Sequence, residues 1–201
     1  MGETISQVFS LEALRSGDRA EFAHLVDAYS KSIYRLAFRM LGDSQDAEDV
    51  LQNIFLKVFQ SLPTFEGRSS ILTWIYRIAV NEALMHIRHQ RPDLQVGIDG
   101  EDTSDNDYTP SQFVDWCCLP EAELLSSESK TYLDRVIQQL PEKLRVVFIL
   151  RDIEGLSIRE TGEALCLTET IVKTRLFRAR MHLRNKLSSY FGERLDMENT
   201  R

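Results

Sequence analysis

The sequence predicts an all-α protein in which two small helical domains are joined by an acidic, flexible linker. Apolar residues recur at helical spacing through long segments on both sides of the middle of the chain. The 201 residues include only nine Gly and five Pro, which disfavours a fold of short strands and tight turns. Residues 92–129 contain ten acidic residues and neither Lys nor Arg. We therefore expect a first domain at residues 1–91, a linker at 92–120, a second domain at 121–190 and a C-terminal tail at 191–201.

Three helices are expected in the first domain. The first spans about residues 18–41 and is ended by Gly42, a residue that favours helix termination. Ser44 is expected to cap the second helix, whose first turn is rich in acids that interact favourably with the helix dipole. The apolar face of this second helix comprises Ala47, Val50, Leu51, Ile54, Phe55, Val58 and Leu62. A polar loop that ends at Ser70 precedes the third helix, at about residues 71–89.

The linker is predicted from composition. Residues 92–120 have no sustained period and are rich in Asp, Ser, Gly and Pro, apart from one apolar island, FVDWCCL. The sequence has three cysteines, Cys117, Cys118 and Cys166. Because their number is odd, a disulfide framework is not expected. The sequence contains no apolar run long enough to span a membrane, and its N-terminus lacks the features of a signal peptide. We expect a cytoplasmic protein.

The second domain begins with a predicted helix at about residues 121–139, and Pro141 is expected to open the next, at 142–152. Two further amphipathic segments follow, LSIRETGEALCL and TETIVKTRLFRARMHLRNKL. Ser157 is expected to cap the first of these and Thr168 the second. The second segment contains six basic residues and one acid. Two short helices, a tight turn and a basic second helix are typical of a helix-turn-helix, whose second helix enters the DNA major groove.

The third helix of the first domain has two faces. Six apolar residues share the side expected to face the core: Leu72, Ile75, Tyr76, Ala79, Ala83 and Ile87. Trp74, Arg77, Asn81 and Arg88 lie on the opposite side. An aromatic ring stacks on unpaired bases, Arg contacts phosphates and Asn reads base edges, so this face is suited to holding a single strand. The alternative is that Trp74, Ile78 and Met85 form a second apolar stripe within the fold.

The basic helix of the helix-turn-helix also has an outward face, formed by Lys173, Thr174, Phe177, Arg178, Met181 and Arg184. Phe177 and Thr174 are suited to contact thymine methyl groups, and Lys173 and Arg178 to reach bases or phosphates. The alternative is a basic amphipathic helix that is merely solvated or binds an acidic partner.

Other residue patterns exclude several function classes. The four histidines and the acids form no catalytic triad, no His-Glu-x-x-His motif, no phosphate-binding loop and no Gly-rich nucleotide turn, so an enzyme is not expected. His86 and His89 lack the paired spacing of a zinc site, and no metal or other cofactor is expected. A small-molecule substrate is not expected either. A redox or metal-sensing role for Cys117 and Cys118 remains a minor alternative.

Three motifs resemble one family, the extracytoplasmic-function sigma factors of bacterial RNA polymerase. DAEDVLQNIFLKVFQSLPTFEG is similar to the helix of that family that binds the polymerase clamp. SSILTWIYRIAVNEALMHIR is similar to its −10-element helix, and LPEKLRVVFILRDIEGLSIRETGEALCLTETIVKTRLFRARMHLR to its −35-element domain. Together the motifs extend over most of residues 18–187, in the family's order and spacing.

The resemblance implies that the loop and third helix capture an unpaired promoter base. Asn81 matches the Asn that recognises the flipped −10 base. Taken together, the resemblance and the polar face of the third helix give the expected −10 contacts: Phe65, Arg68, Ser69, Trp74, Arg77, Asn81 and Arg88. This chain departs from the family in having Glu66 before the loop Gly, where a basic residue is usual. It also has no aromatic residue at Ile71 or Leu72. An altered preference at the −10 element is therefore expected.

In the second domain the resemblance implies contacts with the −35 element. We assign these to Thr168, Thr170, Lys173, Thr174, Phe177, Arg178 and Arg180. The segment from Thr168 to Val172 replaces a Pro-x-Gly-Thr-Val turn and adds bulk and charge near phosphate. Thr161 and Gly162 replace an apolar–Ala pair, and Gly in a helix interior costs about 1 kcal/mol relative to Ala.

The resemblance also implies the partners. Asp49, Gln52, Asn53 and Leu56, on the outer face of the second helix, are expected to bind core RNA polymerase. Promoter DNA and an anti-sigma protein that holds the chain inactive are the other partners implied. A rival function is a helix-turn-helix regulator that acts without polymerase. That function leaves the first domain unexplained, and no dimerisation helix stands out in the sequence, whereas such regulators read paired half-sites as dimers.

Overall fold

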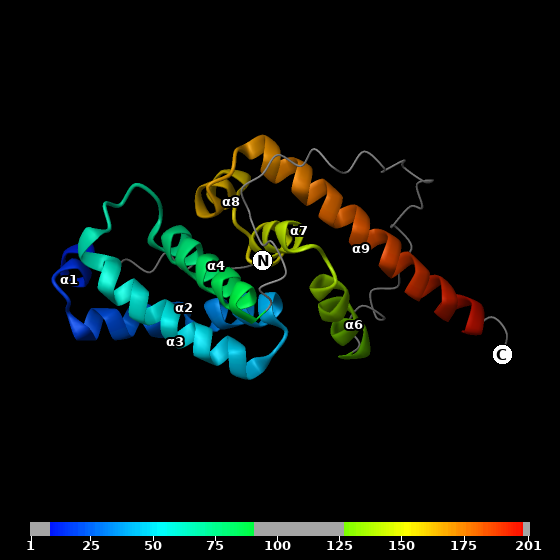
Figure 1. The fold of residues 1–201 in the computed structure, drawn as a ribbon, viewed down its shortest axis with the longest axis horizontal. Coiled ribbons are helices and arrows are strands. Elements are labelled where there is room, and N and C mark those ends of the chain that lie inside the picture. The colour runs from blue at the N-terminus through cyan, green and yellow to red at the C-terminus, as the bar shows by residue number, and fades with distance from the viewer. Residues whose placement is uncertain (1–8, 91–126, 199–201) are drawn as a thin grey trace.

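The structure, a computed structural model, describes residues 9–90 and 127–198, and within these ranges the chain forms helices and turns with no strand (Figure 1). The predicted all-α class is therefore confirmed. The predicted linker, with its FVDWCCL island and the pair Cys117 and Cys118, lies outside the described residues.

The first half of the chain contains α1 (Leu11–Arg15), α2 (Arg19–Leu41), α3 (Ser44–Ser61), a short 3-10 helix η1 (Leu62–Thr64) and α4 (Ile71–Gln90). Helices α2, α3 and α4 pack on one another, and their buried faces include Leu25, Ile33, Leu36, Ile54, Val58, Ile75 and Ala79.

The helix ends in this half are set by local hydrogen bonds. Asp18 caps α2 by accepting from the N–H groups of the second and third helical residues, and Gly42 ends it with a φ of +83°. The prediction that Ser44 caps the next helix is wrong by one residue. Asp43 is the cap, because its carboxylate accepts from the N–H groups of Gln45 and Asp46 at 2.8 and 3.0 Å.

The second half contains α6 (Ser127–Gln138), α7 (Glu142–Phe148), a π-helical segment η3 (Ile149–Ile153), α8 (Ile158–Leu165) and α9 (Glu169–Glu198). The single helix predicted at 142–152 is thus replaced by two elements, since the chain widens into a π turn after Phe148. Helix α9 is longer than predicted and continues to Glu198, into the segment expected to be a tail. The core of this half includes Val136, Ile137, Val147, Ile149, Leu150, Val172 and Ala179.

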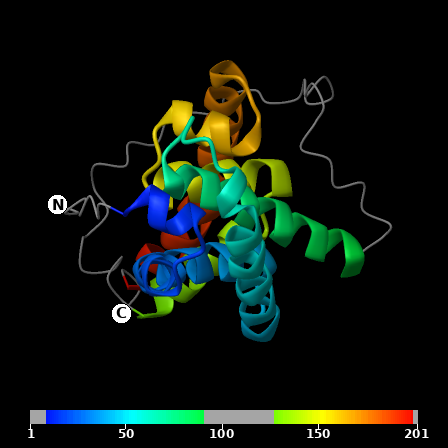
Figure 2. The ribbon, with the colours of Figure 1, turned by 90° about the vertical axis from the view of Figure 1, so that its left-hand side faces the viewer.

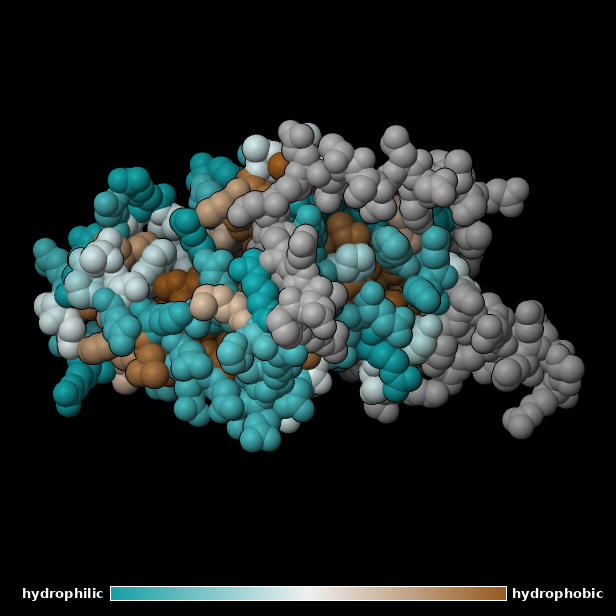
Figure 3. Space-filling view, in the orientation of Figure 1, coloured by the Kyte–Doolittle hydropathy of each residue, from teal (hydrophilic) through white to brown (hydrophobic). Residues whose placement is uncertain are grey.

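The two halves lie against each other. Helix α4 packs beside α8, and α2 contacts α6, α7 and η3 (Figures 1 and 2). Helix α9 runs diagonally and its C-terminal end extends away from the other helices (Figure 1). The face in view in Figure 3 is largely polar, with small, separate apolar patches. None of the described helices is both long and apolar enough to span a membrane.

Candidate nucleic-acid interfaces

The first predicted interface is the outer face of α4 together with the loop before it. Arg77, Asn81 and Arg88 are all exposed, as the helical spacing predicts. In the loop, Arg68 is highly exposed and forms an ion pair with Glu66. The loop therefore presents a guanidinium group beside a carboxylate, directly before the N-terminus of a helix, where the helix dipole favours phosphate.

Phe65 and Trp74 form the apolar base of this interface. The Phe65 side chain is only 6% exposed, and its ring lies 4.8 Å from the Trp74 ring, centroid to centroid. Trp74 itself is half-buried and packs on the core. The structure therefore combines the two alternatives considered from the sequence: Trp74 belongs partly to the core, whereas Met85 on the same helix is exposed. Phe65 flanks the interface from inside and offers it little surface.

Hydrogen bonds hold both ends of the loop. At the end next to α4, the Ser70 hydroxyl accepts from the Thr73 N–H at 3.0 Å and shares a 2.7 Å hydrogen bond with the Thr73 hydroxyl. This is the side-chain cap that the first turn of a helix requires. At the other end, Arg15 of α1 donates from Nε and Nη2 to the Phe65 carbonyl, at 2.9 and 2.6 Å. Arg15 is 50 residues from Phe65, and no sequence signal connected the two.

The second predicted interface is built from local contacts. Ser157 caps α8 through a capping box: its hydroxyl accepts from the Glu160 N–H, and the Glu160 carboxylate accepts from the Ser157 N–H. Hydrogen bonds from the Ser157 side chain and backbone to the Glu160 carboxylate lower the pKa of Glu160. The turn then places Cys166 in the left-handed region, with a φ of +55°. Both the cap and the turn are therefore where the sequence predicts them.

Gly162 is required by this turn. The Leu167 N–H donates to the Gly162 carbonyl at 2.9 Å, and a Cβ at Gly162 would lie 2.7 Å from the Leu167 carbonyl oxygen. The expectation that Gly is merely less favourable than Ala here is corrected, because Ala does not fit without a backbone shift. Glycine permits the close approach of α8 to the turn.

Helix α9 presents the residues predicted to read DNA. Thr168, Thr170, Lys173 and Thr174 are exposed, and Phe177 is 61% exposed, which is unusual for so large an apolar ring. Arg178 is half-buried. The exposed set extends from the turn along one stretch of α9, as a recognition helix requires.

Two basic residues of α9, Arg180 and Arg175, contact other parts of the second half. Arg180 pairs with Asp152 of η3 through two hydrogen bonds of 2.8 and 2.7 Å, which raise the pKa of Arg180. The guanidinium of Arg180 is thus held toward η3. Arg175 is only 1% exposed and lies within the second half, although its charge gave no indication of burial.

A third surface lies on α3. Asp49, Gln52 and Asn53 are exposed, and Leu56 is 59% exposed. Phe59 extends this face and was not singled out in the sequence. Its ring packs edge-to-face on Phe22 of α2, with 4.9 Å between the centroids. A polar face that contains exposed apolar side chains is suited to bind another protein.

The contact between the halves is polar at its centre. The Glu154 side chain is 3% exposed, and one of its oxygens accepts from the Tyr76 hydroxyl at 3.0 Å. Arg35 and Arg39 approach the same carboxylate at 3.8 Å. Burial and the charge of Glu154 raise the pKa of Tyr76, so the phenol keeps the proton that it donates. Nearby, Arg145 of α7 donates to the Met40 carbonyl of α2 at 2.8 Å.

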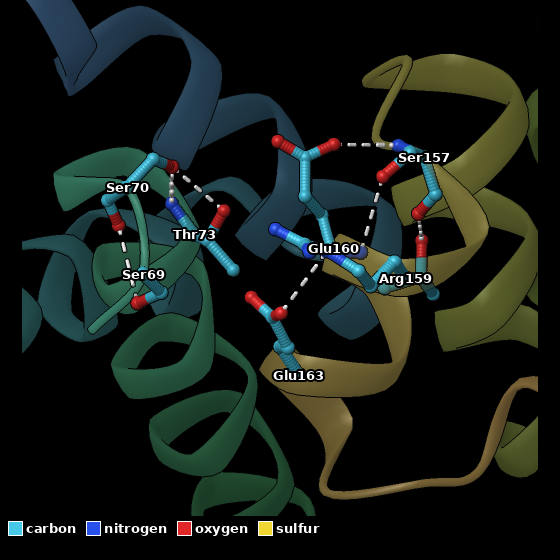
Figure 4. A network of polar contacts seen from close by, with 8 residues as sticks. Ser69, Ser70, Thr73, Ser157, Arg159, Glu160 and Glu163 are labelled. Atoms are coloured by element: carbon cyan, nitrogen blue, oxygen red, sulfur yellow. Dashed lines mark hydrogen bonds and ion pairs between the residues drawn. The ribbon is translucent and has the colours of Figure 1, made fainter.

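This contact also places the loop before α4 next to α8. Ser69, Ser70 and Thr73, at the start of α4, lie beside the first turns of α8 in Figure 4. The acidic side chains of Glu160 and Glu163 belong to those turns, and Glu163 pairs with Arg159 at 3.4 Å. The loop predicted to capture a base therefore lies on the side of α4 next to α8, the helix that carries Glu160 and Glu163.

Between the halves there is also a polar groove, lined by Met40, Leu41, Ile87, Gln90, Gln138, Glu142 and Arg145. Its side chains include none of the residue groupings that hold a metal ion, and no such grouping of His, Cys, Asp and Glu occurs elsewhere in the described residues. His86 instead lies 3.2 Å from Asp46, which also accepts from Gln90.

Comparison with known proteins gives the family. Residues 25–92 match the family model for Sigma-70 region 2, and residues 130–183 match that for Sigma-70, region 4. The ECF RNA polymerase sigma factor SigW of Bacillus subtilis is 36% identical over 178 residues, which cover 88% of this chain and 94% of that protein. The chain belongs to the extracytoplasmic-function sigma factors. The ECF RNA polymerase sigma-E factor of Haemophilus influenzae is 35% identical over 190 residues, which cover 93% of the sigma factor described here and 98% of the Haemophilus protein.

Solved structures share the fold of this sigma factor. The structure of CnrH in complex with the cytosolic domain of CnrY matches with a TM-score of 0.63 and 21% identity, over 89% of this chain and 95% of that chain. The sigma factor RpoE of Bartonella quintana, in complex with the anti-sigma factor NepR, matches with a TM-score of 0.63 and 20% identity, over 84% and 97%. At these identities the likeness concerns the fold.

Proposed function

We propose that this sigma factor binds core RNA polymerase, directs it to promoters through separate −10 and −35 contacts, and promotes strand opening. The observation that carries the proposal is that one chain has two chemically different faces, each suited to a different form of nucleic acid. The α4 face combines a partly exposed aromatic ring with Arg and Asn, as single strands require. The α9 face is a basic recognition helix suited to duplex DNA.

At the −10 element, Asn81 reads the edge of a flipped base, and Trp74 supplies the apolar wall beside it. Arg77, Arg88 and Arg68 hold phosphates, and Ser69 contacts the backbone of the strand. Phe65 acts from inside the fold, by supporting Trp74. Glu66 pairs with Arg68 and so reduces the positive charge of the loop. This change alters which −10 sequences the loop prefers.

At the −35 element, Lys173, Thr174, Phe177 and Arg178 contact the major groove, and Phe177 reads thymine methyl groups. Thr168 and Thr170, at the start of α9, contact phosphates. Arg180 joins them only when its pair with Asp152 opens.

The remaining contacts are with proteins. Asp49, Gln52, Asn53 and Leu56 bind the polymerase, with Phe59 completing the apolar part of that face. The first domain comprises residues 1–91 and the second comprises residues 121–190. The linker at residues 92–120 lets the two domains separate on the polymerase. The protein acts in the cytoplasm and is held inactive by an anti-sigma protein. Support for this inhibitor comes from the RpoE relative of the same fold, which is bound to an anti-sigma factor.

The test is transcription from a promoter library by purified core polymerase, with and without the full chain. The same assay includes Asn81→Ala and Arg178→Ala. Gln139→Ala and Lys31→Ala serve as matched controls, because both are exposed residues outside the three faces. Chain-dependent transcripts that share −35 and −10 motifs are expected. Asn81→Ala should lose discrimination at the −10 element, and Arg178→Ala should weaken use of the −35 element.

The result that contradicts the proposal is binding of duplex DNA by the chain alone with no chain-dependent transcript. The function would then be that of a helix-turn-helix regulator. If either alanine variant behaved like its control, the corresponding face would be assigned wrongly even though the class of function held.

A further inference from the structure

We propose that Arg15 is a positioning residue for base capture: it holds the loop at residues 65–70 in the shape that presents Trp74 and Asn81 to an unpaired base. This inference rests on the proposed function of that loop. It concerns a residue of α1, which precedes the segment matched by the region 2 family model at residues 25–92.

The geometry of the contact is specific. Two donors of one guanidinium, Nε and Nη2, converge on the Phe65 carbonyl at 2.9 and 2.6 Å. Hydrogen bonds from a charged donor are stronger than those between neutral groups, and the planar fork restricts the angle of approach. Arg15 therefore fixes both the position and the orientation of this peptide group.

Arg15 is itself held in place. The neighbouring Leu14 is only 1% exposed, and the Ser10 N–H donates to the Glu21 carboxylate of α2 at 2.7 Å. The Phe9 ring contacts the ring of Tyr29 on α2, at 5.5 Å between centroids. Helix α1 is thus anchored on the first half before its last residue reaches the loop. An anchored donor transmits position, whereas a donor on a loose terminus would follow the loop.

The Phe65 peptide is the point at which the loop begins. Its N–H donates to the Leu62 carbonyl at 3.1 Å and so closes η1, and its ring packs on Trp74. Two residues later the chain reverses at Gly67, with a φ of +76°. A Cβ at Gly67 would lie 4.0 Å from Nη2 of Arg15, so the guanidinium also borders this turn. With Ser70 capping α4, Arg15 completes the bracing of the loop at both ends.

Arg15 also brings positive charge to the loop, and this second effect must be separated from positioning. Lysine keeps the charge and supplies a single donor, whereas Gln supplies a donor without charge. Arg19, four residues later, is exposed and lies at the first position of α2, so Arg19→Ala removes one positive charge nearby without a loop contact. Arg19→Ala is therefore the matched control.

The experiment uses the full chain with core polymerase. It measures binding of a single-stranded oligonucleotide that carries the −10 motif found in the promoter library, against one with the recognised base replaced. Variants are Arg15→Ala, Arg15→Lys, Arg15→Gln and Arg19→Ala. Affinity for core polymerase and for a −35 duplex is measured in parallel. Trp74 emission is recorded separately on the chain without polymerase, in a Trp116→Phe background in which Trp74 is its only tryptophan.

We expect Arg15→Ala to lower discrimination between the two oligonucleotides by about tenfold, the loss typical of a charge-assisted hydrogen bond. Arg15→Lys should recover part of it, and Trp74 emission should shift to longer wavelength in Arg15→Ala alone. Core and duplex affinities, and all properties of Arg19→Ala, should stay within about twofold of the wild type.

Three results would overturn the proposal. Unchanged discrimination in Arg15→Ala would show that the loop keeps its shape without the fork. Equal losses in Arg15→Ala and Arg19→Ala would assign the effect to charge alone, and parallel losses of core and duplex binding would assign it to general stability. Failure of the proposed function is a different outcome: the wild type itself would then not distinguish the two oligonucleotides, and the role of Arg15 would fall with it.

Discussion

The two predicted DNA surfaces of this sigma factor are held by different kinds of contact. The helix-turn-helix is built from neighbours in sequence: Ser157 with Glu160, Gly162 with Leu167, and Thr168 with Ile171. The surface predicted to capture a base needs α1, the loop and α4 together, and the hydrogen bonds from Arg15 to the Phe65 carbonyl join residues 50 positions apart. We therefore expect the first kind of surface to tolerate changes elsewhere in the chain, and the second to depend on the packing of its whole half.

The contact between the halves is a third case, since it joins α2 and α4 to the second half through buried charge. One oxygen of Glu154 and two nitrogens of Arg39 are buried without a hydrogen-bond partner among the described residues. Incompletely satisfied buried charges contribute little net stability. The polar centre of this contact therefore adds little to the free energy that holds the halves together.

Phe65→Ala is expected to have the largest effect, and it tests whether the two surfaces are independent. Removing a buried aromatic ring costs about 3–5 kcal/mol, and here the loss falls on the loop and on Trp74. Urea unfolding and Trp74 emission, again in the Trp116→Phe background, should both change, while binding of a −35 duplex by the same variant should not. Phe65→Leu, which keeps most of the volume, is the control and should cost much less. A matching loss of duplex binding would mean that the two surfaces are not independent.

Glu154→Gln should loosen the contact between the halves by about 1–3 kcal/mol, because the charge that Arg35 and Arg39 approach is removed. The radius of gyration from small-angle scattering should rise while the helical content from circular dichroism stays constant. Glu163→Gln, which alters an exposed pair on α8, should change neither. An unchanged radius for Glu154→Gln would indicate that apolar contacts alone hold the halves together.

Gly162→Ala tests the close contact between α8 and the turn. The test depends on whether the substitution raises or lowers the stability of the protein. In an ordinary helix interior the change stabilises by about 1 kcal/mol. Here the new Cβ would lie 2.7 Å from a backbone oxygen, and we expect a loss of about 1–3 kcal/mol with weaker −35 duplex binding. Cys166→Gly, at a φ of +55°, should instead be neutral or stabilising by up to about 1 kcal/mol. A stabilised Gly162→Ala variant would refute the close approach of α8 to the turn.

The smallest expected effect is that of Ser157→Ala, which removes the cap of α8 and costs about 1 kcal/mol in urea unfolding at neutral pH. The pKa of Glu160 is lower in the folded protein than in the unfolded chain, so its contribution is complete above the unfolded pKa. That contribution disappears as the pH falls through the lower, folded pKa. The difference in stability between wild type and Ser157→Ala should therefore shrink below about pH 4. A constant difference would mean that Glu160 does not take part in the cap.

Most of the fold was predictable because its signals are local. The apolar periods of α2, α3 and α4, the cap at Ser157 and the turn before Thr168 all depend on residues within a few positions of one another. Errors occurred where competing local choices were close in free energy. Asp43 and Ser44 are both good caps, and the π turn of η3 interrupts an apolar period that reads as a single helix.

The sequence by itself determined the all-α class, the helix-turn-helix and the exposed face of Arg77, Asn81 and Arg88, since helical periodicity sets which side chains share a face. Only the tertiary structure decided that Arg15 braces the loop, that Phe65 is buried beneath Trp74, and that Glu154 lies between the halves. The physical reason is distance along the chain. A hydrogen bond or ring contact between remote residues leaves no period in the sequence, and it exists only after the helices have packed.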